Sequence, residues 1–327
     1  MILINLIGKI YSCYILFVKK DIFKTKEGKE YLQMYAESEV KLWFFKSHAK
    51  LKGFRLINKY VDTKKKSDTV FILGSGESIN DLKKQDWDYI KDHNIIGLNY
   101  SFVHPVIPDY HFMEMIPLKE MQEFFCEITQ EKYKDVDMFF QYKHILKSGF
   151  DLKKYEHNER MCVYVPHLYP TIHDDILEFY FLDLKKVKKL NFSHLIHHNS
   201  HIGSAVMFAQ LLGYKKIVML GIDLNGGDYF TNSKVPSEVF PENQDYKKMN
   251  ELRDEHNRYT KDFKNDKHPT VNENLLKNRG CVSMDTYFRI YNKIILKDNN
   301  VKLFVNTEKS ILSKDLDVFD FKNDLYK

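Results

Sequence analysis

Two short segments place small, hydroxyl and imidazole side chains where a phosphate could bind. The first contains Gly74, Ser75, Gly76 and Ser78 directly after an apolar run that ends at Leu73. The two glycines can adopt positive φ angles and let the backbone approach a ligand closely. The two serines and the amides of the next helix can donate hydrogen bonds to phosphate oxygens. The pattern therefore predicts a nucleotide or nucleotide-sugar site, or only a tight strand-to-helix turn, because the third glycine of the dinucleotide fingerprint is missing.

The second segment is rich in histidine and precedes a predicted helix. His201 and Ser204 stand near the start of that helix, where free amides attract anions and His201 can act as a cation or proton donor. Histidines four residues apart would share a helical face, which also suggests a metal site. The four histidines are His194, His197, His198 and His201. No glutamate in the segment completes a zinc-protease signature, so we expect no bound metal.

Other candidates follow predicted strands or lie in a long polar segment. Asn99 carries an amide that suits a base or ribose edge, or it forms an Asn turn. Glu114 is either a ligand contact or a solvated loop carboxylate. Asp223 either works at a strand end or caps the next loop, and Tyr229 can cover a base or phosphate. His268 lies in the charged, proline-containing segment 230–280, which predicts a lid, and His268 can serve there as a general base.

A sheet is needed to bring these residues together. Short apolar runs alternate with helical patterns along residues 67–327, which predicts an α/β, Rossmann-like, doubly wound domain with a mainly parallel sheet. Ligands of such sheets bind at the carboxyl ends of the strands. The expected strands are Thr69–Leu73, Ile95–Leu98, Tyr110–Met113, Met138–Tyr142, Met161–Val165, Ile217–Leu220 and Val301–Val305. The expected helices between them include Leu118–Lys132, Ser204–Leu212 and Thr286–Leu296.

Residues 1–66 are predicted to form a helical N-terminal extension. Apolar residues recur at helical spacing within residues 1–20, and lysines follow up to residue 26. This pattern predicts either an interfacial helix on an anionic membrane or a helix packed on the body of the protein or on a partner subunit. The apolar run Ile10–Val18 is too short to span a bilayer, and the absence of a small-residue cleavage site disfavours a signal peptide.

Charge and cysteine usage exclude further classes of protein. The 50 basic and 45 acidic residues are interspersed and give a net charge of +5, so a nucleic-acid partner is poorly supported. The 4 cysteines form no Cys-x-x-Cys pair, which argues against a zinc site or a disulfide framework and fits a reducing compartment. We therefore expect a cytoplasmic protein, peripheral on the inner face of the cell membrane. The sequence does not decide whether the chain forms a homo-oligomer.

Several motifs occur together in a fixed order. They are Phe71–Ser78, Gly97–Tyr100, Asn199–Val206 and Leu212–Asp223, followed by Val301–Val305 with Ser310–Leu312. This order resembles the bacterial sialyltransferases of glycosyltransferase family 42, and the similarity covers roughly residues 69–312. The resemblance implies a GT-A-like Rossmann-type fold. It also implies transfer of a nonulosonic acid from a CMP-activated donor to a glycolipid or oligosaccharide acceptor, in surface-polysaccharide biosynthesis, with no metal and no further cofactor.

The resemblance also implies roles for individual residues. The expected nucleotide contacts are Gly74, Ser75, Gly76, Ser78, Asn99, Ser204 and Tyr229, to which the strand-end position adds Asp223. Glu114, His201 and Asn225 are expected to contact the substrate, at positions where the family has asparagine, arginine and tyrosine. The family's catalytic histidine falls near Ser283, so His268, about fifteen residues earlier, is the histidine expected to replace it as the base.

Two other classes share parts of this pattern. Proteins related to the archaeal hydroxymethylpterin diphosphokinase have a similar Gly-x-Gly-x-Ser turn and a similar approach to the strand at Ile217. They would transfer diphosphate from ATP with magnesium held by carboxylates such as Asp223 and Asp228. A non-catalytic subunit of a polysaccharide-assembly complex is the third alternative.

Overall fold

A parallel β-sheet organises the chain. The computed structural model describes residues 26–325 except 156, 168–170, 172, 188–189, 199 and 261–267. Within these residues eight parallel strands form one sheet in the order β5-β4-β3-β2-β1-β6-β7-β8. The strands are β1 Thr69–Leu73, β2 Asn94–Leu98, β3 Tyr110–Met113, β4 Asp137–Gln141, β5 Met161–Tyr164, β6 Lys216–Leu220, β7 Lys302–Val305 and β8 Asp317–Val318. The predicted Rossmann-like α/β fold is confirmed, and β8 is the one strand here that the apolar runs did not predict.

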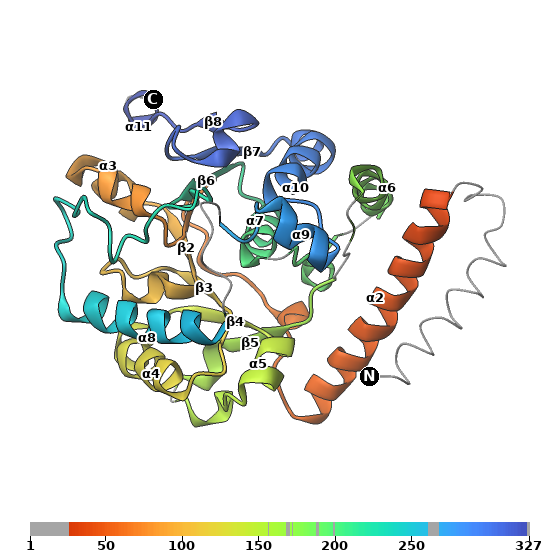
Figure 1. Cartoon of the computed structure of the whole chain (residues 1–327), viewed down its shortest axis with the longest axis horizontal. Helices are drawn as coiled ribbons and strands as arrows, with labels where there is room; N and C mark the ends of the chain where they lie inside the picture. Colours follow the sequence, from red (N-terminus) through yellow and green to blue (C-terminus); the bar gives the residue numbers. More distant parts are fainter. Residues whose placement is uncertain are drawn as a thin grey trace.

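Helices cover both faces of the sheet. Side chains alternate along β1, so Val70 and Ile72 pack into one buried cluster while Phe71 and Leu73 pack into the other. Figure 1 shows α6, α7 and α10 on one side of the sheet and α3, α4 and α8 on the other. The helices are α2 Lys26–Leu51, α3 Lys84–Lys91, α4 Lys119–Lys132, α5 Tyr142–Ser148, α6 Asp174–Lys185, α7 His201–Leu211, α8 Gln244–Thr260, α9 Glu273–Arg279, α10 Met284–Tyr291 and α11 Phe321–Leu325.

The strand order reverses next to β1. From β1 the chain builds the sheet outward through β2, β3, β4 and β5, and it then returns to add β6 on the free side of β1. The turns after β1 and β6 therefore leave the sheet side by side. A reversal of this kind opens a crevice at the carboxyl ends of the strands, where open α/β sheets bind ligands.

The long helix α2 is packed on the sheet domain. It lies against α6 and α5. The Tyr31 hydroxyl donates to Asp183 Oδ2 at 3.2 Å, and the Tyr142 hydroxyl lies 2.8 Å from His48 Nδ1. Residues 1–25, which carry the predicted membrane contact, lie outside the described residues. Among the helices that the structure does describe, none combines the length and the apolar character needed to cross a bilayer.

The segment predicted as a lid contains α8 and α9. Helix α8 packs against α4, where Lys248 Nζ lies 2.8 Å from Glu127 Oε2 and 4.6 Å from the centre of the Phe124 ring. On the inner face of α8, Tyr246 and Met249 are buried in the core. This segment therefore forms part of the folded domain and supplies one wall of the pocket described next.

Candidate functional site

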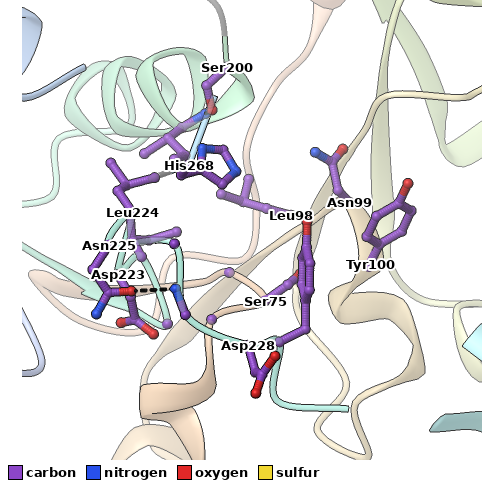
Figure 2. Close-up of a pocket in the computed structure, with 18 of the residues that line it drawn as sticks. Ser75, Leu98, Asn99, Tyr100, Ser200, Asp223, Leu224, Asn225, Asp228 and His268 are labelled. Atoms are coloured by element: carbon purple, nitrogen blue, oxygen red, sulfur yellow. Dashed lines mark hydrogen bonds between the residues drawn. The ribbon is translucent and has the colours of Figure 1, made fainter. Parts of the chain in front are cut away.

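A pocket of about 330 Å³ lies at the reversal of the strand order, within the size range of small-molecule sites. Its walls come from the turns after β1, β2 and β6, the start of α7, helix α8 and the short segment His268–Pro269. Figure 2 shows Ser200 and His268 on one side of this space and Asn99 and Tyr100 on the other. The predicted residues that line it are Gly74, Ser75, Gly76, Asn99, His201, Asp223, Asn225, Tyr229 and His268.

Three amides of the glycine turn after β1 donate to the protein and not to this pocket. The N–H groups of Gly74 and Gly76 donate to Leu220 O and Gly221 O, each at 2.8 Å. The Glu77 N–H donates to Asp228 O at 3.1 Å, so these donors are already used by the turn after β6. The turn leads into a 3₁₀ helix, Glu77–Asp81, rather than directly into an α-helix. Our expectation that these amides would cradle a phosphate is therefore not met in this structure.

The two glycines are required by packing instead. Gly74 and Gly76 do not adopt positive φ angles, and Gly76 has a φ of −70°. A Cβ at Gly74 would lie 2.6 Å from Gly221 O, and one at Gly76 would lie 2.4 Å from Asp223 Oδ2. Both distances are too short for real contacts. The glycines thus allow the turns after β1 and β6 to approach each other, a purpose that the sequence pattern could not distinguish from approach to a ligand.

Asp223 lines the pocket and pairs with the buried Ser78, which does not. Both the Ser78 hydroxyl and the Ser78 N–H donate to the Asp223 carboxylate. Burial raises the pKa of Asp223, and the two bonds from Ser78 oppose that rise. Ser78 is only 1% exposed and is not part of the pocket wall. The predicted nucleotide contact at Ser78 is therefore replaced by a contact to Asp223. Asp223 has a structural partner, but in the turn after β1 and not in the next loop, which the sequence had offered as the alternative.

Aromatic and cationic side chains from three elements form one wall of the pocket: Tyr100 after β2, Tyr229 after β6 and Arg253 on α8. The Arg253 guanidinium lies 4.3 Å from the centre of the Tyr229 ring. The Tyr100 and Tyr229 rings pack edge to face, with 6.3 Å between their centres. Arg253 is 5% exposed and has Asp254 as an ion-pair partner at 3.6 Å. A buried guanidinium beside aromatic rings suits a phosphate or carboxylate and the base next to it.

Arg253 was missed from the sequence, although a signal for it exists. It lies in phase with Tyr246 and Met249 at spacings of three and four residues, so it belongs to the inward face of α8. An arginine on an apolar helical face needs a partner, and here it finds one in the pocket. Arginine on the buried stripe of an otherwise charged helix was the pattern to look for.

Asn99 and Asn225 line the pocket but hold the backbone as well. Asn99 has a positive φ of 44°, and its Oδ1 accepts the Glu114 N–H at 2.9 Å. Within the described part of the chain, no group binds its amide nitrogen, which can therefore serve a ligand. Asn225 Oδ1 accepts the Gly227 N–H at 2.9 Å and its Nδ2 donates to Lys309 O at 3.2 Å, which shapes the turn shown in Figure 2.

The start of α7 opens into the pocket. Ser200 caps the helix by accepting the Ile202 N–H at 3.2 Å, and Ser200, His201 and Ile202 all line the pocket. The positive end of the helix dipole therefore faces the site. Ser204, predicted as a nucleotide contact, is fully buried, and its hydroxyl donates to Ile196 O at 2.7 Å. It lies one turn too deep in α7 to reach the pocket.

His268 is placed at the edge of the same pocket. Its Nδ1 lies 2.8 Å from Thr270 Oγ1 and 3.4 Å from the Thr270 N–H. Burial, together with the charge of Arg279, lowers the pKa of His268 to about 4, so the ring is neutral at pH 7. A phosphate bound nearby would raise this pKa toward neutrality. The other histidine of the segment, His256, is not among the residues that line the pocket.

Glu114 belongs to a neighbouring cluster of histidines. It lies outside the pocket wall, 2.8 Å from His144 Nε2 and 3.4 Å from His201 Nε2. Burial would raise the pKa of Glu114, but the hydrogen bond from His144 and the surrounding imidazoles hold it well below its usual range. Burial lowers the pKa of His201 to about 3 and that of His197 to about 4. His201 is thus the residue shared by this cluster and the pocket.

No family model, curated protein or solved structure matches this chain. The site is therefore interpreted from its own residues.

Proposed function

We propose that the pocket binds a CMP-activated nonulosonic acid and that the protein is a glycosyltransferase. The observation that carries this proposal is the convergence, in one pocket at the reversal of the sheet, of a guanidinium, a helix N-terminus and a neutral imidazole. Arg253 and the start of α7 would hold the anionic donor, and Tyr100, Tyr229 and Asn99 would contact its nucleoside. A glycolipid acceptor suits a chain that carries apolar and lysine-rich residues within positions 1–26.

In the proposed transfer, His268 acts as the general base. The base is the tautomer that donates Nδ1–H to Thr270 Oγ1 and gives up the longer bond, 3.4 Å, from the Thr270 N–H. In this tautomer the Nε2 atom has a free lone pair that can take the proton of the acceptor hydroxyl. The acceptor oxygen then forms a bond to the anomeric carbon while the bond to the CMP phosphate breaks. Arg253 stabilises the charge on the departing phosphate, and a preorganised donor of this kind is worth about 3 kcal/mol in other enzymes.

A magnesium-dependent diphosphokinase is the second candidate, since Asp223, Asp228 and Asp254 all line the pocket. Carboxylates are the usual protein ligands of magnesium. However, both oxygens of Asp223 already accept hydrogen bonds from Ser78. The candidate carboxylate with the best strand-end position is thus engaged by the protein, and we favour the glycosyltransferase.

A thermal-shift panel of CMP, CDP, UDP, GDP and ATP, each with and without magnesium, tests the proposal. We expect CMP and CDP to stabilise the protein without magnesium, by about 2.7 kcal/mol at concentrations near 100 times Kd. Stabilisation by ATP only in the presence of magnesium would favour the diphosphokinase. A protein that responds to none of the five nucleotides would not be a nucleotide-dependent transferase.

An Arg253→Ala variant locates the binding site. A charge-assisted hydrogen bond is worth about 1.5–3 kcal/mol, so we expect CMP affinity to fall roughly 10-fold to 100-fold. Lys248→Ala is the matched control, because Lys248 lies on the same helix and faces α4 instead of the pocket. Equal CMP affinity in both variants, measured by calorimetry, would remove Arg253 from the site.

A further inference from the structure

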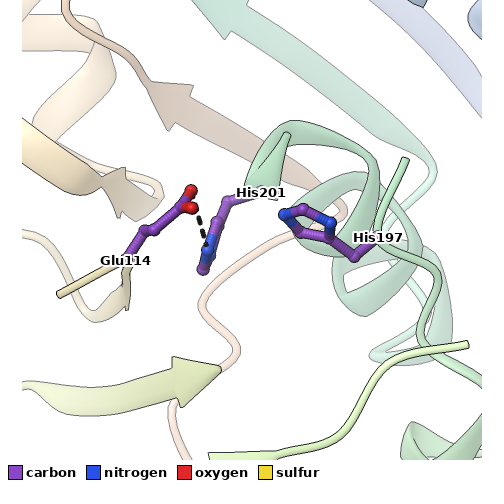
Figure 3. Close-up of side chains that lie close together, drawn as sticks. All are labelled: Glu114, His197 and His201. Carbon is purple, nitrogen blue, oxygen red and sulfur yellow. Dashed lines mark ion pairs between the residues drawn. The ribbon is translucent and has the colours of Figure 1, made fainter. Parts of the chain in front are cut away.

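Three potential metal ligands converge beside the pocket. Glu114 follows β3, His197 precedes α7, and His201 is the first residue of α7. One side-chain atom from each residue lies within 4.8 Å of the corresponding atoms of the other two. Among the described residues this is the only set of three or more histidine, cysteine or acidic side chains with such spacing. Figure 3 shows Glu114 facing His201, with His197 beside it.

One ring nitrogen of His201 already has a protein partner. His201 Nδ1 is 2.8 Å from the Tyr164 hydroxyl. When the Nδ1 proton is donated to the Tyr164 oxygen, His201 Nε2 carries a lone pair and can bind a cation.

The second ring nitrogen of His201 faces two other possible metal ligands. The Nε2 atoms of His201 and His197 are both buried, and neither has a hydrogen-bond partner among the described residues. Glu114 Oε2 lies 3.4 Å from His201 Nε2, while Glu114 Oε1 accepts a hydrogen bond from His144 Nε2 at 2.8 Å. Buried polar atoms without partners call for an explanation, and a cation held between these three side chains would supply one.

We propose that Glu114, His197 and His201 bind a divalent transition-metal ion, and that the ion is zinc. Two imidazoles and one carboxylate form a recurrent zinc ligand set that leaves a fourth position open. Tetrahedral bonds of about 2.0–2.1 Å would bring the ligand atoms to about 3.3 Å from one another. The present separations, at most 4.8 Å, must therefore shorten by at most about 1.5 Å when the ion binds.

Neighbouring groups already have the arrangement of an outer shell. Metal-bound histidines usually donate their other N–H to an oxygen, and the Tyr164 hydroxyl lies 2.8 Å from His201 Nδ1, where it can accept such a bond. Metal-bound carboxylates are themselves hydrogen-bonded, as Glu114 is to His144. The ion would tie the end of β3 to the start of α7 and so fix the pocket wall that contains His201. This site goes beyond the proposed glycosyl transfer, which needs no metal.

Metal analysis of the full chain, with any affinity tag removed, tests the site. We expect about one zinc per chain by mass spectrometry, and stoichiometric rebinding of ZnCl₂ after chelation in the presence of a competing chromophoric chelator. Co²⁺ in place of zinc should give the visible absorption of a tetrahedral site with nitrogen and oxygen ligands. Iron or nickel at one per chain with the same ligands would support the site but not the choice of ion.

Ligand variants distinguish this site from adventitious binding. His197→Gln, His201→Gln and Glu114→Gln should each weaken zinc binding at least 100-fold, whereas His194→Gln should not. His194 is the matched control, because it lies in the same segment and its ring stacks on His167 instead. His197 is partly exposed, so its variant separates lost binding from lost folding, which circular dichroism checks. Wild-type zinc affinity in the His197 and Glu114 variants, or an equal loss in the His194 variant, would overturn the proposal.

The zinc and nucleotide experiments can each reject one proposal without rejecting the other. A protein that binds one zinc but no CMP would keep this site and lose the proposed transfer. A protein that binds CMP equally well with and without ZnCl₂, and never more than a trace of zinc, would lose the metal site alone.

Discussion

The turn after β1 and the cluster of Glu114, His197 and His201 both lie at the carboxyl ends of the strands. They differ in how their polar groups are used. In the turn, the amides of Gly74, Gly76 and Glu77 all donate to protein oxygens. In the cluster, two imidazole nitrogens are buried without partners among the described residues. The turn has the more familiar motif, but the cluster has the unsatisfied groups.

This difference shows what a glycine-rich pattern can and cannot indicate. Glycine allows close approach of the backbone, and the approaching group here is the turn after β6. Buried polar atoms without partners are rare in folded proteins and each calls for an explanation such as a ligand or an ion. Two such atoms side by side, next to a carboxylate, are therefore a better guide to a binding site than the glycine pattern. Four predictions test the comparison, from the largest expected effect to the smallest.

Gly76→Val should destabilise the fold by at least about 3 kcal/mol or prevent folding, because its side chain would overlap the Asp223 carboxylate and Gly221 O. Urea denaturation measures this effect. Ser75→Ala, in the same turn, is the control and should change stability little. A Gly76→Val protein that folds with wild-type stability but no longer binds CMP would return the turn to its predicted role at the phosphate.

His268→Ala should lower kcat by about 10²-fold with little change in CMP affinity, as expected for the loss of a general base. His256→Ala is the control, because it lies in the same segment but does not line the pocket. Steady-state transfer assays on both variants give the answer. If His268→Ala keeps wild-type kcat, the imidazole is not the base and the acceptor proton leaves by another route.

Acid should destabilise the protein through buried neutral histidines such as His104. Burial, helped by the charge of Lys132, lowers the pKa of His104 to about 3, while an unfolded histidine titrates near 6.5. The unfolded state therefore takes up the proton first, and stability falls as the pH falls from about 7 toward 3. At pH 5 the loss from this residue is about 2 kcal/mol. The His104 Nδ1 accepts the Val106 N–H, a bond that requires the proton of the neutral ring to lie on Nε2.

The matching variant is His104→Phe, which keeps an aromatic ring against Trp87. Unfolding free energies at pH 7.5 and pH 5 should differ by about 2 kcal/mol less in this variant than in the wild type. Parallel pH profiles would show that His104 is protonated at the same pH in both states.

Ser78→Ala should cost about 1–2 kcal/mol at pH 7, because it leaves the buried Asp223 carboxylate with one hydrogen bond fewer. Burial raises the pKa of Asp223 above that of an unfolded aspartate. Ionising Asp223 therefore lowers the free energy of unfolding as the pH rises through its pKa. The Ser78 hydroxyl offsets this cost only while Asp223 is ionised. Denaturation midpoints should therefore differ more between variant and wild type at pH 7 than at pH 4. An equal difference at both values would mean that Ser78 does not act through the charge.

The sequence predicted the sheet well because parallel strands buried on both faces are continuous apolar runs. The predicted Ile217–Leu220 differs from β6 by one residue, and Tyr110–Met113 equals β3. β8 was not predicted, because Asp317–Val318 is too short to form an apolar run. Local patterning is sufficient for such elements.

The sites were harder to predict, because their contacts join distant parts of the chain. The histidines were noticed, but a helical face was expected, whereas α7 begins only at His201 and leaves His197 in the preceding loop. The missing acidic partner was sought within that segment, and it is Glu114 from the end of β3. Only the strand order brings these residues together, and that order is not encoded in any local pattern.

The pairing of β1 with β6 also has a consequence for synthesis. Thr69 pairs with Lys216, so one edge of β1 has no strand beside it while β2, β3, β4 and β5 leave the ribosome. Closing so long a loop is slow compared with pairing neighbouring segments. The growing chain therefore carries an open apolar edge, a known hazard for association between nascent chains, until Lys216–Leu220 emerge. The pocket, which needs the turns after both strands, is among the last parts of the sheet domain to assemble.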